Sequence, residues 1–179
     1  MDSDYFGDLA AHEGCCTWLY CDAWGNATTG IGNLVADADA CAALPWTGTD
    51  DPRDVYTRVL NAFGPVKPGS SAYANLSDLR LTLDVVTGLV SQRLEAEFLP
   101  GLRRLCPGFD GFPLAARRAL VDMAYNLGVG GLAKFVHLLA ACNAGDWETA
   151  EAQCHRSTCR DSRNGWTANM FAAAAAAGG

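Results

Sequence analysis

Two carboxylates near the start of the chain, Glu13 and Asp22, stand nine residues apart, and a hydroxyl at Thr28 follows six residues later. Such a set could cleave a glycosidic bond, because one carboxyl can protonate the leaving oxygen while the other activates water or stabilises charge. Thr28 would then hold that water beside Asp22. A solvated glutamate and a turn-favouring aspartate account for the same spacing without catalysis. The spacing alone therefore leaves both interpretations open.

A short helix is expected to carry Glu13. Within residues 4–13, apolar side chains recur at three- and four-residue spacing, and Gly14 stands where a C-cap would. We expect Cys15, Trp18 and the helical lobe to wall in Glu13, so that burial keeps it protonated longer than Asp22, which would lie nearer water. His12 should point about 100° around the helix from Glu13 and is given no role.

A hairpin is expected to carry Asp22 and Thr28. Residues 17–21 and 27–31 are rich in β-forming side chains, and they flank a turn sequence at residues 24–26. A helix end that faces such a hairpin makes one edge of a cleft.

Helical patterns dominate the rest of the chain. Apolar side chains repeat at helical spacing near residues 52–63, 82–98, 112–131, 132–154 and 165–176. Asp51, before Pro52, is expected to cap the first of these helices, and an Asn-Ala-Gly turn should divide residues 132–154 into two helices. Pro100 or Pro107 is expected to end the second of these helices. The predicted fold class is α+β and mainly α, with the first helix and a hairpin lobe over about 1–81 and a helical lobe over about 82–179. Residues 35–81 give few signals beyond one helix.

Composition limits the class of protein. The chain has 179 residues, half of them hydrophobic, which suits a single two-lobed domain. Thirteen basic and twenty acidic residues give a net charge of −7, which argues against nucleic acid or an anionic membrane as the main partner. The sequence has no run of about 18 uninterrupted apolar residues, so it predicts no membrane span. Its first residues lack the basic start and apolar centre of a secretory signal.

Eight cysteines are many for this length, but their spacing fits no zinc site. An even number is typical of disulfides formed in an oxidising compartment, although buried free thiols fit equally well. Cys142 with Cys154 is one plausible bridge, and Cys41 with Cys15 or Cys16 is another. The cysteines favour a protein that acts outside the cytoplasm, whether secreted, periplasmic or phagolysosomal.

The residues around Glu13 and Asp22 resemble the phage-type (T4-type) lysozymes, the endolysins of glycoside hydrolase family 24. The likeness rests on Glu13-Gly14, Tyr20-x-Asp22, Gly25 and the run Thr28-x-Gly30-Ile31-Gly32. A second block, residues 116–135, resembles the central helix of the family, and residues 143–153 resemble its next helix pair. Arg163 stands eight residues before Phe171, as the family pattern expects. Residues 35–81 match the family poorly.

This resemblance implies a lysozyme-like fold and a muramidase, which would hydrolyse the β-1,4 bond between N-acetylmuramic acid and N-acetylglucosamine in bacterial peptidoglycan. Glu13 would be the general acid, and Asp22 with Thr28 would position the water, with inversion at the anomeric carbon. Because Thr29 also carries a hydroxyl, the catalytic threonine is ambiguous by one residue. The resemblance implies no metal or organic cofactor, and we expect a monomer.

The resemblance also marks residues that would line the cleft, namely Leu34, Tyr125, Asn126 and Gln153. Trp24, at the expected hairpin tip, could stack on a sugar, and Arg163 could reach back to Glu13 and support it. Tyr125 fits core packing equally well. Two alternatives to the muramidase stay open: a catalytically inactive relative that binds glycan, and a hydrolase of chitin-type glycans on the same scaffold.

Overall fold

The computed structural model describes residues 3–69 and 71–177. It is mainly helical with one three-stranded antiparallel sheet, which confirms the predicted α+β, mainly α, class. Contacts between residues divide the chain into two compact units. Residues 13–92 form the sheet unit, and residues 3–12 and 93–177 belong to the helical unit.

The borders of these units differ from those of the expected lobes. Helix α1 (Ser3–Glu13) groups with the helical unit up to His12, and α4 (Leu83–Arg93) groups with the sheet unit up to Gln92. One contact that ties α1 to the helical unit is an ion pair, in which Arg118 donates two hydrogen bonds of 2.6 Å to the carboxylate of Asp8. This partner lies 110 residues away, so no local pattern could have revealed it.

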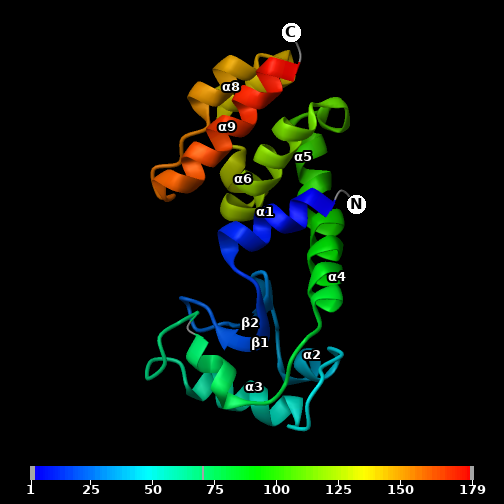
Figure 1. The fold of residues 1–179 in the computed structure, drawn as a ribbon, viewed down its shortest axis with the longest axis vertical. Coiled ribbons are helices and arrows are strands. Elements are labelled where there is room, and N and C mark those ends of the chain that lie inside the picture. Colours follow the sequence, from blue (N-terminus) through cyan, green and yellow to red (C-terminus); the bar gives the residue numbers. More distant parts are fainter. Residues whose placement is uncertain (1–2, 70, 178–179) are drawn as a thin grey trace. The chain divides into compact units, whose positions relative to one another are not determined.

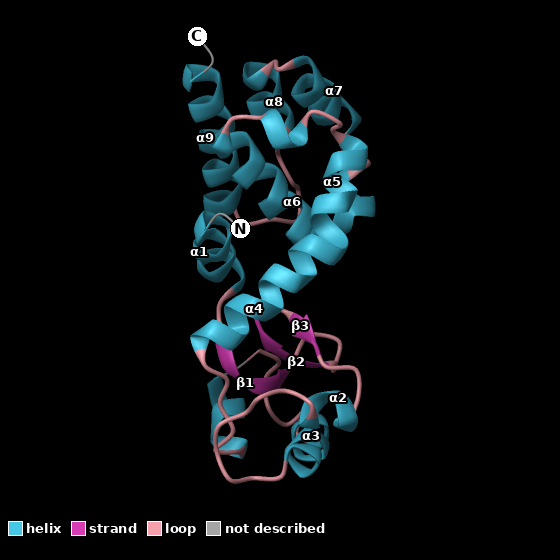
Figure 2. Ribbon diagram, turned by 90° about the vertical axis from the view of Figure 1, so that its right-hand side faces the viewer, coloured by secondary structure: helices cyan, strands magenta, loops and turns pink. Residues whose placement is uncertain are grey.

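Three short strands that follow one another along the chain form the sheet (Figure 2). β1 (Cys16–Cys21) pairs with β2 (Ala27–Gly30), and β2 pairs with β3 (Asn33–Leu34), all antiparallel. The predicted hairpin is confirmed. Strand β3 was not foreseen, because two residues carry no alternation signal.

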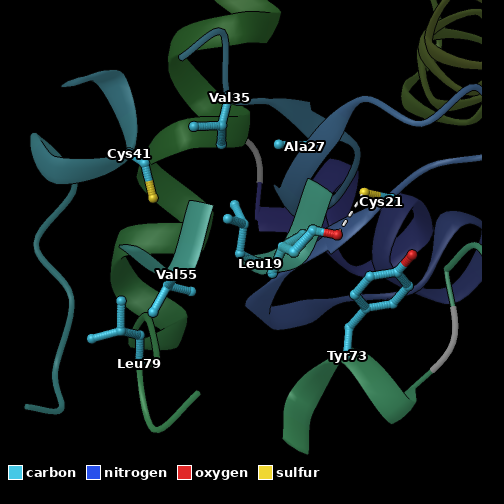
Figure 3. Close-up of a cluster of buried hydrophobic side chains, with 9 residues drawn as sticks. Leu19, Cys21, Ala27, Val35, Cys41, Val55, Tyr73 and Leu79 are labelled. Atoms are coloured by element: carbon cyan, nitrogen blue, oxygen red, sulfur yellow. Dashed lines mark hydrogen bonds between the residues drawn. The ribbon is translucent and has the colours of Figure 1, made fainter. Parts of the chain in front are cut away.

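The core of the sheet unit is shared between the sheet and the segments that follow it. These are α2 (Ala38–Ala42), α3 (Pro52–Asn61) and the 3-10 helix η1 (Ser71–Leu76). Figure 3 shows side chains from β1, α3 and η1 directed into one cluster, which comprises Leu19, Cys21, Ala27, Val35, Cys41, Val55, Val59, Tyr73 and Leu79. Residues 35–81, which gave few sequence signals, therefore supply most of this core.

Helix α6 (Leu114–Leu132) lies at the centre of the helical unit, and its buried face includes Ala116, Leu120, Met123 and Ala124. The helices that accompany it are α5 (Leu99–Leu105), α7 (Val136–Ala144), α8 (Trp147–Gln153) and α9 (Asp161–Ala177). Helix α9 packs on both α6 and α8, and Figure 1 shows α8 and α9 side by side. The predicted pair of helices joined by a short turn is confirmed as α7 and α8.

Helical conformation continues beyond its predicted end near Phe98. A wide π-helical turn, η2 (Leu94–Phe98), precedes α5, and Pro100 is the second residue of α5. In a regular helix the proline ring clashes with the carbonyl four residues earlier, and a wider turn at that place relieves the clash. Pro100 therefore does not end the helix, which runs on to Leu105.

All eight cysteines are free thiols. The expected bridges, Cys142 with Cys154 and Cys41 with Cys15 or Cys16, are therefore wrong. Burial raises the pKa of the Cys142 thiol to about 12 and that of Cys41 to about 11. These cysteines act as small apolar side chains in the two cores, which is the alternative that the sequence left open.

In residues 3–69 and 71–177, no helix by itself has the length and apolar character needed to span a membrane. Helices α6 and α7, which meet at a bend of 115°, have that length and apolar character only when they are taken together. The same residues contain no group of three or more His, Cys, Asp or Glu side chains arranged to hold a metal ion.

Candidate active site

Asp22 closes the turn between β1 and β2. Its Oδ1 accepts hydrogen bonds from the backbone amides of Trp24 and Asn26, at 2.8 and 2.9 Å. Its Oδ2 accepts a hydrogen bond of 3.0 Å from the side-chain amide of Asn26. An aspartate that binds the backbone two residues ahead is typical turn chemistry. Asp22 therefore stabilises the turn, as the sequence allowed. It is only half-buried, so its carboxylate can also take part in chemistry.

The same hydrogen bonds keep Asp22 charged. Burial acts to raise its pKa, but the side-chain bond from Asn26 and the backbone bonds from Asn26, Trp24 and Gly25 outweigh burial and hold the pKa below its usual value. Asp22 is therefore ionised at neutral pH. A group that activates water or stabilises positive charge has to be in this state.

The two neighbouring threonines are both buried, but their hydroxyls have different partners. Thr29 is fully buried, and its hydroxyl donates to the carbonyl of Trp18 on β1 at 3.1 Å. The hydroxyl of Thr28 donates to the carbonyl of Asn26 at 3.1 Å, and Asn26 is the residue that also binds Asp22. Because successive side chains of a strand point to opposite faces, Thr28 and not Thr29 shares the surroundings of Asp22. Of the two threonines, Thr28 is therefore the one that lies with Asp22.

The sheet register aligns further predicted residues with Thr28. Thr28 pairs with Tyr20 of β1 and with Leu34 of β3. Leu34 is 66% exposed, and Trp24, at the hairpin tip, is 83% exposed. Both side chains of the sheet unit that were predicted to contact sugar are therefore open to solvent.

Glu13 is the last residue of α1. Gly14 follows it with a φ of 82°, a left-handed conformation that ends the helix as predicted. The side chain of Glu13 is exposed, whereas Asp22 is half-buried. The prediction that Glu13 is the more shielded carboxylate is therefore wrong.

The glycines after Thr28 shape the backbone of this region. Gly30 has a φ of 63°, and a Cβ at this position would lie 3.3 Å from Cγ1 of Val86 on α4. Gly32 also has a positive φ, of 67°. The glycine spacing therefore has a physical reason: it forms the turn from β2 to β3 and lets α4 approach the sheet closely.

The helical unit contains a buried ionic cluster that the sequence analysis missed. Asp122 of α6 and Arg156, which precedes α9, each have a side chain 1% exposed, and Arg156 donates to Asp122 at 3.0 Å. Arg163 of α9 donates to both oxygens of Asp122, at 2.7 Å for the shortest bond. Burial acts to raise the pKa of Asp122, but the hydrogen bonds and charge of Arg163, with His12 and Arg156, hold it below its usual value.

His12 joins this cluster from α1. Its Nδ1 lies 2.8 Å from Oδ1 of Asp122, and its ring meets the ring of Trp166 edge-on at 4.6 Å. His12 was given no role from the sequence, and Arg163 was considered as a partner of Glu13. Arg163 donates hydrogen bonds to Asp122, and its pairing with Glu13 stays a prediction. One signal could have exposed the cluster: Asp122 interrupts the apolar face of a long helix, where an acid is rarely left unpaired.

Two predicted residues of the helical unit, Tyr125 and Asn126, follow Asp122 on α6. Tyr125 is 9% exposed, its ring packs on Phe98 with centroids 5.0 Å apart, and the guanidinium of Arg93 lies 4.9 Å from its centroid. The core-packing interpretation of Tyr125 is thus realised. Asn126 is exposed, and its side-chain oxygen accepts a hydrogen bond of 3.3 Å from Arg156.

The last predicted residue of the helical unit is Gln153. It is the exposed last residue of α8, and it lines a pocket together with His137, Asp146 and Thr149. Polar groups of several kinds surround this pocket, but no contact described here links Gln153 to Tyr125 or Asn126.

No family model matches the chain. It is 28% identical over 145 residues to the pre-baseplate central spike protein Gp5 of Enterobacteria phage T4. The alignment covers 79% of this chain and 22% of that protein, so the chain spans about a fifth of the length of its relative. The likeness is distant, and it connects the chain with a structural protein of a phage.

Proposed function

We propose that the chain is a muramidase of the phage-type lysozyme kind, which hydrolyses the β-1,4 bond between N-acetylmuramic acid and N-acetylglucosamine and so lyses the bacterial wall outside the cytoplasm. The hairpin carries this proposal, because a single residue, Asn26, hydrogen-bonds both Asp22 and Thr28. These are the two groups that the resemblance assigns to the attacking water. The distant likeness to a phage spike protein gives further support.

In this mechanism Glu13 protonates the leaving glycosidic oxygen, and ionised Asp22 takes a proton from the attacking water. The hydroxyl of Thr28 donates to a carbonyl, so its lone pairs remain available to accept a hydrogen bond from that water. Attack from the face opposite the leaving group inverts the anomeric carbon. Trp24 and Leu34 would contact sugar from the sheet unit, and Tyr125, Asn126 and Gln153 from the helical unit.

The deciding experiment follows the clearing of a suspension of bacterial cell walls. Wild-type protein should clear it, and Glu13→Gln should not, because glutamine has no proton to transfer to the leaving group. Glu148→Gln makes the same change at an exposed position of α8 and should clear the suspension like the wild type. Equal clearing by wild type and Glu13→Gln would show that Glu13 is not the acid.

Two measurements separate the alternatives. If wild-type protein releases no fragments but sediments with peptidoglycan, the chain is a glycan-binding relative and the enzymatic proposal fails. If it releases reducing ends from chitin and not from peptidoglycan, the reaction class holds and the substrate is wrong. For the active enzyme, proton NMR of the first product should show the α-anomer, as inversion of a β-linkage requires.

A further inference from the structure

Asn26 lies in the turn between β1 and β2 and contacts two proposed catalytic groups, Asp22 and Thr28. Its backbone amide donates to Oδ1 of Asp22 at 2.9 Å, and its side-chain amide donates to Oδ2 at 3.0 Å. Its carbonyl accepts one hydrogen bond from the backbone amide of Asp22 at 3.0 Å and one from the hydroxyl of Thr28 at 3.1 Å. Four hydrogen bonds thus connect Asn26 with Asp22 and Thr28.

Any residue at this position could make the three bonds that use backbone atoms. The bond from the side chain is the one that depends on asparagine. The backbone amides of the turn occupy Oδ1 of Asp22, and the side chain of Asn26 supplies a donor to Oδ2. Donors on both oxygens fix the rotation of the carboxylate group. The side chain of Asn26 is itself exposed, so core packing does not explain it.

We propose that Asn26 is a positioning residue of the catalytic site, whose side chain fixes the orientation of the Asp22 carboxylate. This proposal rests on the proposed muramidase function and names a residue that the resemblance did not mark. A donor to Oδ2 stabilises the charged carboxylate more than the neutral acid. Asn26 therefore extends the activity of the enzyme toward acid pH, where an unsupported aspartate would be protonated and unable to take a proton from water.

Among the groups that lower the pKa of Asp22, the side chain of Asn26 has the largest effect. The neighbouring titratable group is the thiol of Cys21, whose pKa is raised by burial and further by the charge of Asp22, so it stays neutral in the acid range. The groups that lower the pKa of Asp22 are uncharged donors of the turn, namely Asn26, Trp24 and Gly25.

The test combines two measurements on three variants. The ionisation of Asp22 is followed by the carbon NMR signal of its side-chain carboxyl during a pH titration, and cell-wall clearing is measured over the same pH range. Asn26→Ala removes the donor and keeps the backbone bonds. Asn26→Asp keeps the shape but replaces the donor with a second carboxyl group. Asn75→Ala, at an exposed position of η1, is the matched control.

We expect the Asp22 titration to move to higher pH in Asn26→Ala and further in Asn26→Asp, where two acids face each other. On the acid limb, clearing by Asn26→Ala should fall about threefold relative to its own maximum, since loss of one bond to a partly exposed carboxylate changes its ionisation equilibrium by about that factor. Asn75→Ala should match the wild type in both measurements. A general loss of stability would lower clearing at all pH values and would not produce this shift.

The outcomes separate this inference from the function on which it rests. If wild-type protein clears walls and Asn26→Ala has an unchanged Asp22 titration and an unchanged acid limb, the role of Asn26 is refuted and the muramidase stands. If wild-type protein does not clear walls, the muramidase is refuted, and the catalytic meaning of Asn26 falls with it, whatever the NMR titration shows.

Discussion

Replacement of Asp122 by asparagine should destabilise the helical unit strongly. The side chains of Asp122 and Arg156 are each 1% exposed and that of Arg163 is 9% exposed, so the change removes the buried negative charge that both guanidinium groups bind. Breaking a buried ion pair from one side costs about 3–5 kcal/mol of unfolding free energy. At about 2–4 °C per kcal/mol for a chain of this length, Tm should fall by roughly 10 °C.

Urea unfolding followed by circular dichroism at neutral pH measures this loss, and Asp110→Asn is the matched control. Asp110 accepts two hydrogen bonds from the Nε of Arg103 and one from its Nη2, but its side chain is 64% exposed. Solvent screens such a pair, so the control should leave the midpoint nearly unchanged. Similar shifts for Asp122→Asn and Asp110→Asn would refute the reasoning, because burial would then not determine the cost. Adding Arg156→Met to Asp122→Asn should restore part of the stability, since one uncompensated charge is removed.

The pH dependence of this loss has a definite sign. The pKa of Asp122 in the folded protein lies below its ordinary value of 3.8. The contribution of Asp122 to stability is therefore complete above that value and is lost as the pH falls through the lower, folded pKa. The difference in stability between wild type and Asp122→Asn should be full at neutral pH and should narrow below about pH 4.

Further expected outcomes concern the sheet unit and the thiols. Thr29→Val should lower the unfolding free energy by about 1–3 kcal/mol, because the carbonyl of Trp18 loses the donor that buried Thr29 supplies, whereas Thr28→Val should abolish clearing at a smaller cost in urea stability. Gly30→Ala should destabilise the protein by about 1–2 kcal/mol in thermal melting, owing to its φ of 63° and the nearby Val86. Native protein should react slowly with thiol reagents at Cys142, because burial raises the pKa of this thiol to about 12. After denaturation all eight thiols should react, and fewer than eight modified cysteines in mass spectrometry would contradict the free state.

Features of the fold that depend on neighbouring residues could be predicted from the sequence. Asp51 was expected to cap α3, and its carboxylate accepts hydrogen bonds from two amides of the first helical turn. The turn between α7 and α8 was expected from its Asn-Ala-Gly sequence, and Gly145 takes a left-handed conformation there. These signals succeed because a cap or a turn is decided within a few residues, whatever the rest of the chain does.

Features that depend on distant residues could not be predicted in this way. The partners of Asp122 lie 34, 41 and 110 residues away, and the charge of an aspartate does not indicate which cations it will meet. The burial of Glu13 was predicted wrongly for the same reason, since exposure depends on what the fold brings near. Within the candidate site, the sequence located Asp22 and the adjacent threonines, and the strand register was needed to choose Thr28.

The carboxylate of Asp22 closes the turn with the same hydrogen bonds that keep it ionised. Replacing Asp22 by alanine removes the turn contacts and the charge together, so loss of clearing in that variant would not distinguish a missing base from a distorted hairpin. Truncation of the Asn26 side chain is more selective, because it leaves the backbone bonds to Oδ1 of Asp22 in place and removes only the donor to Oδ2. The chemistry proposed for this hairpin can therefore be separated from its stability by removing the donor of Asn26, although not by removing the side chain of Asp22.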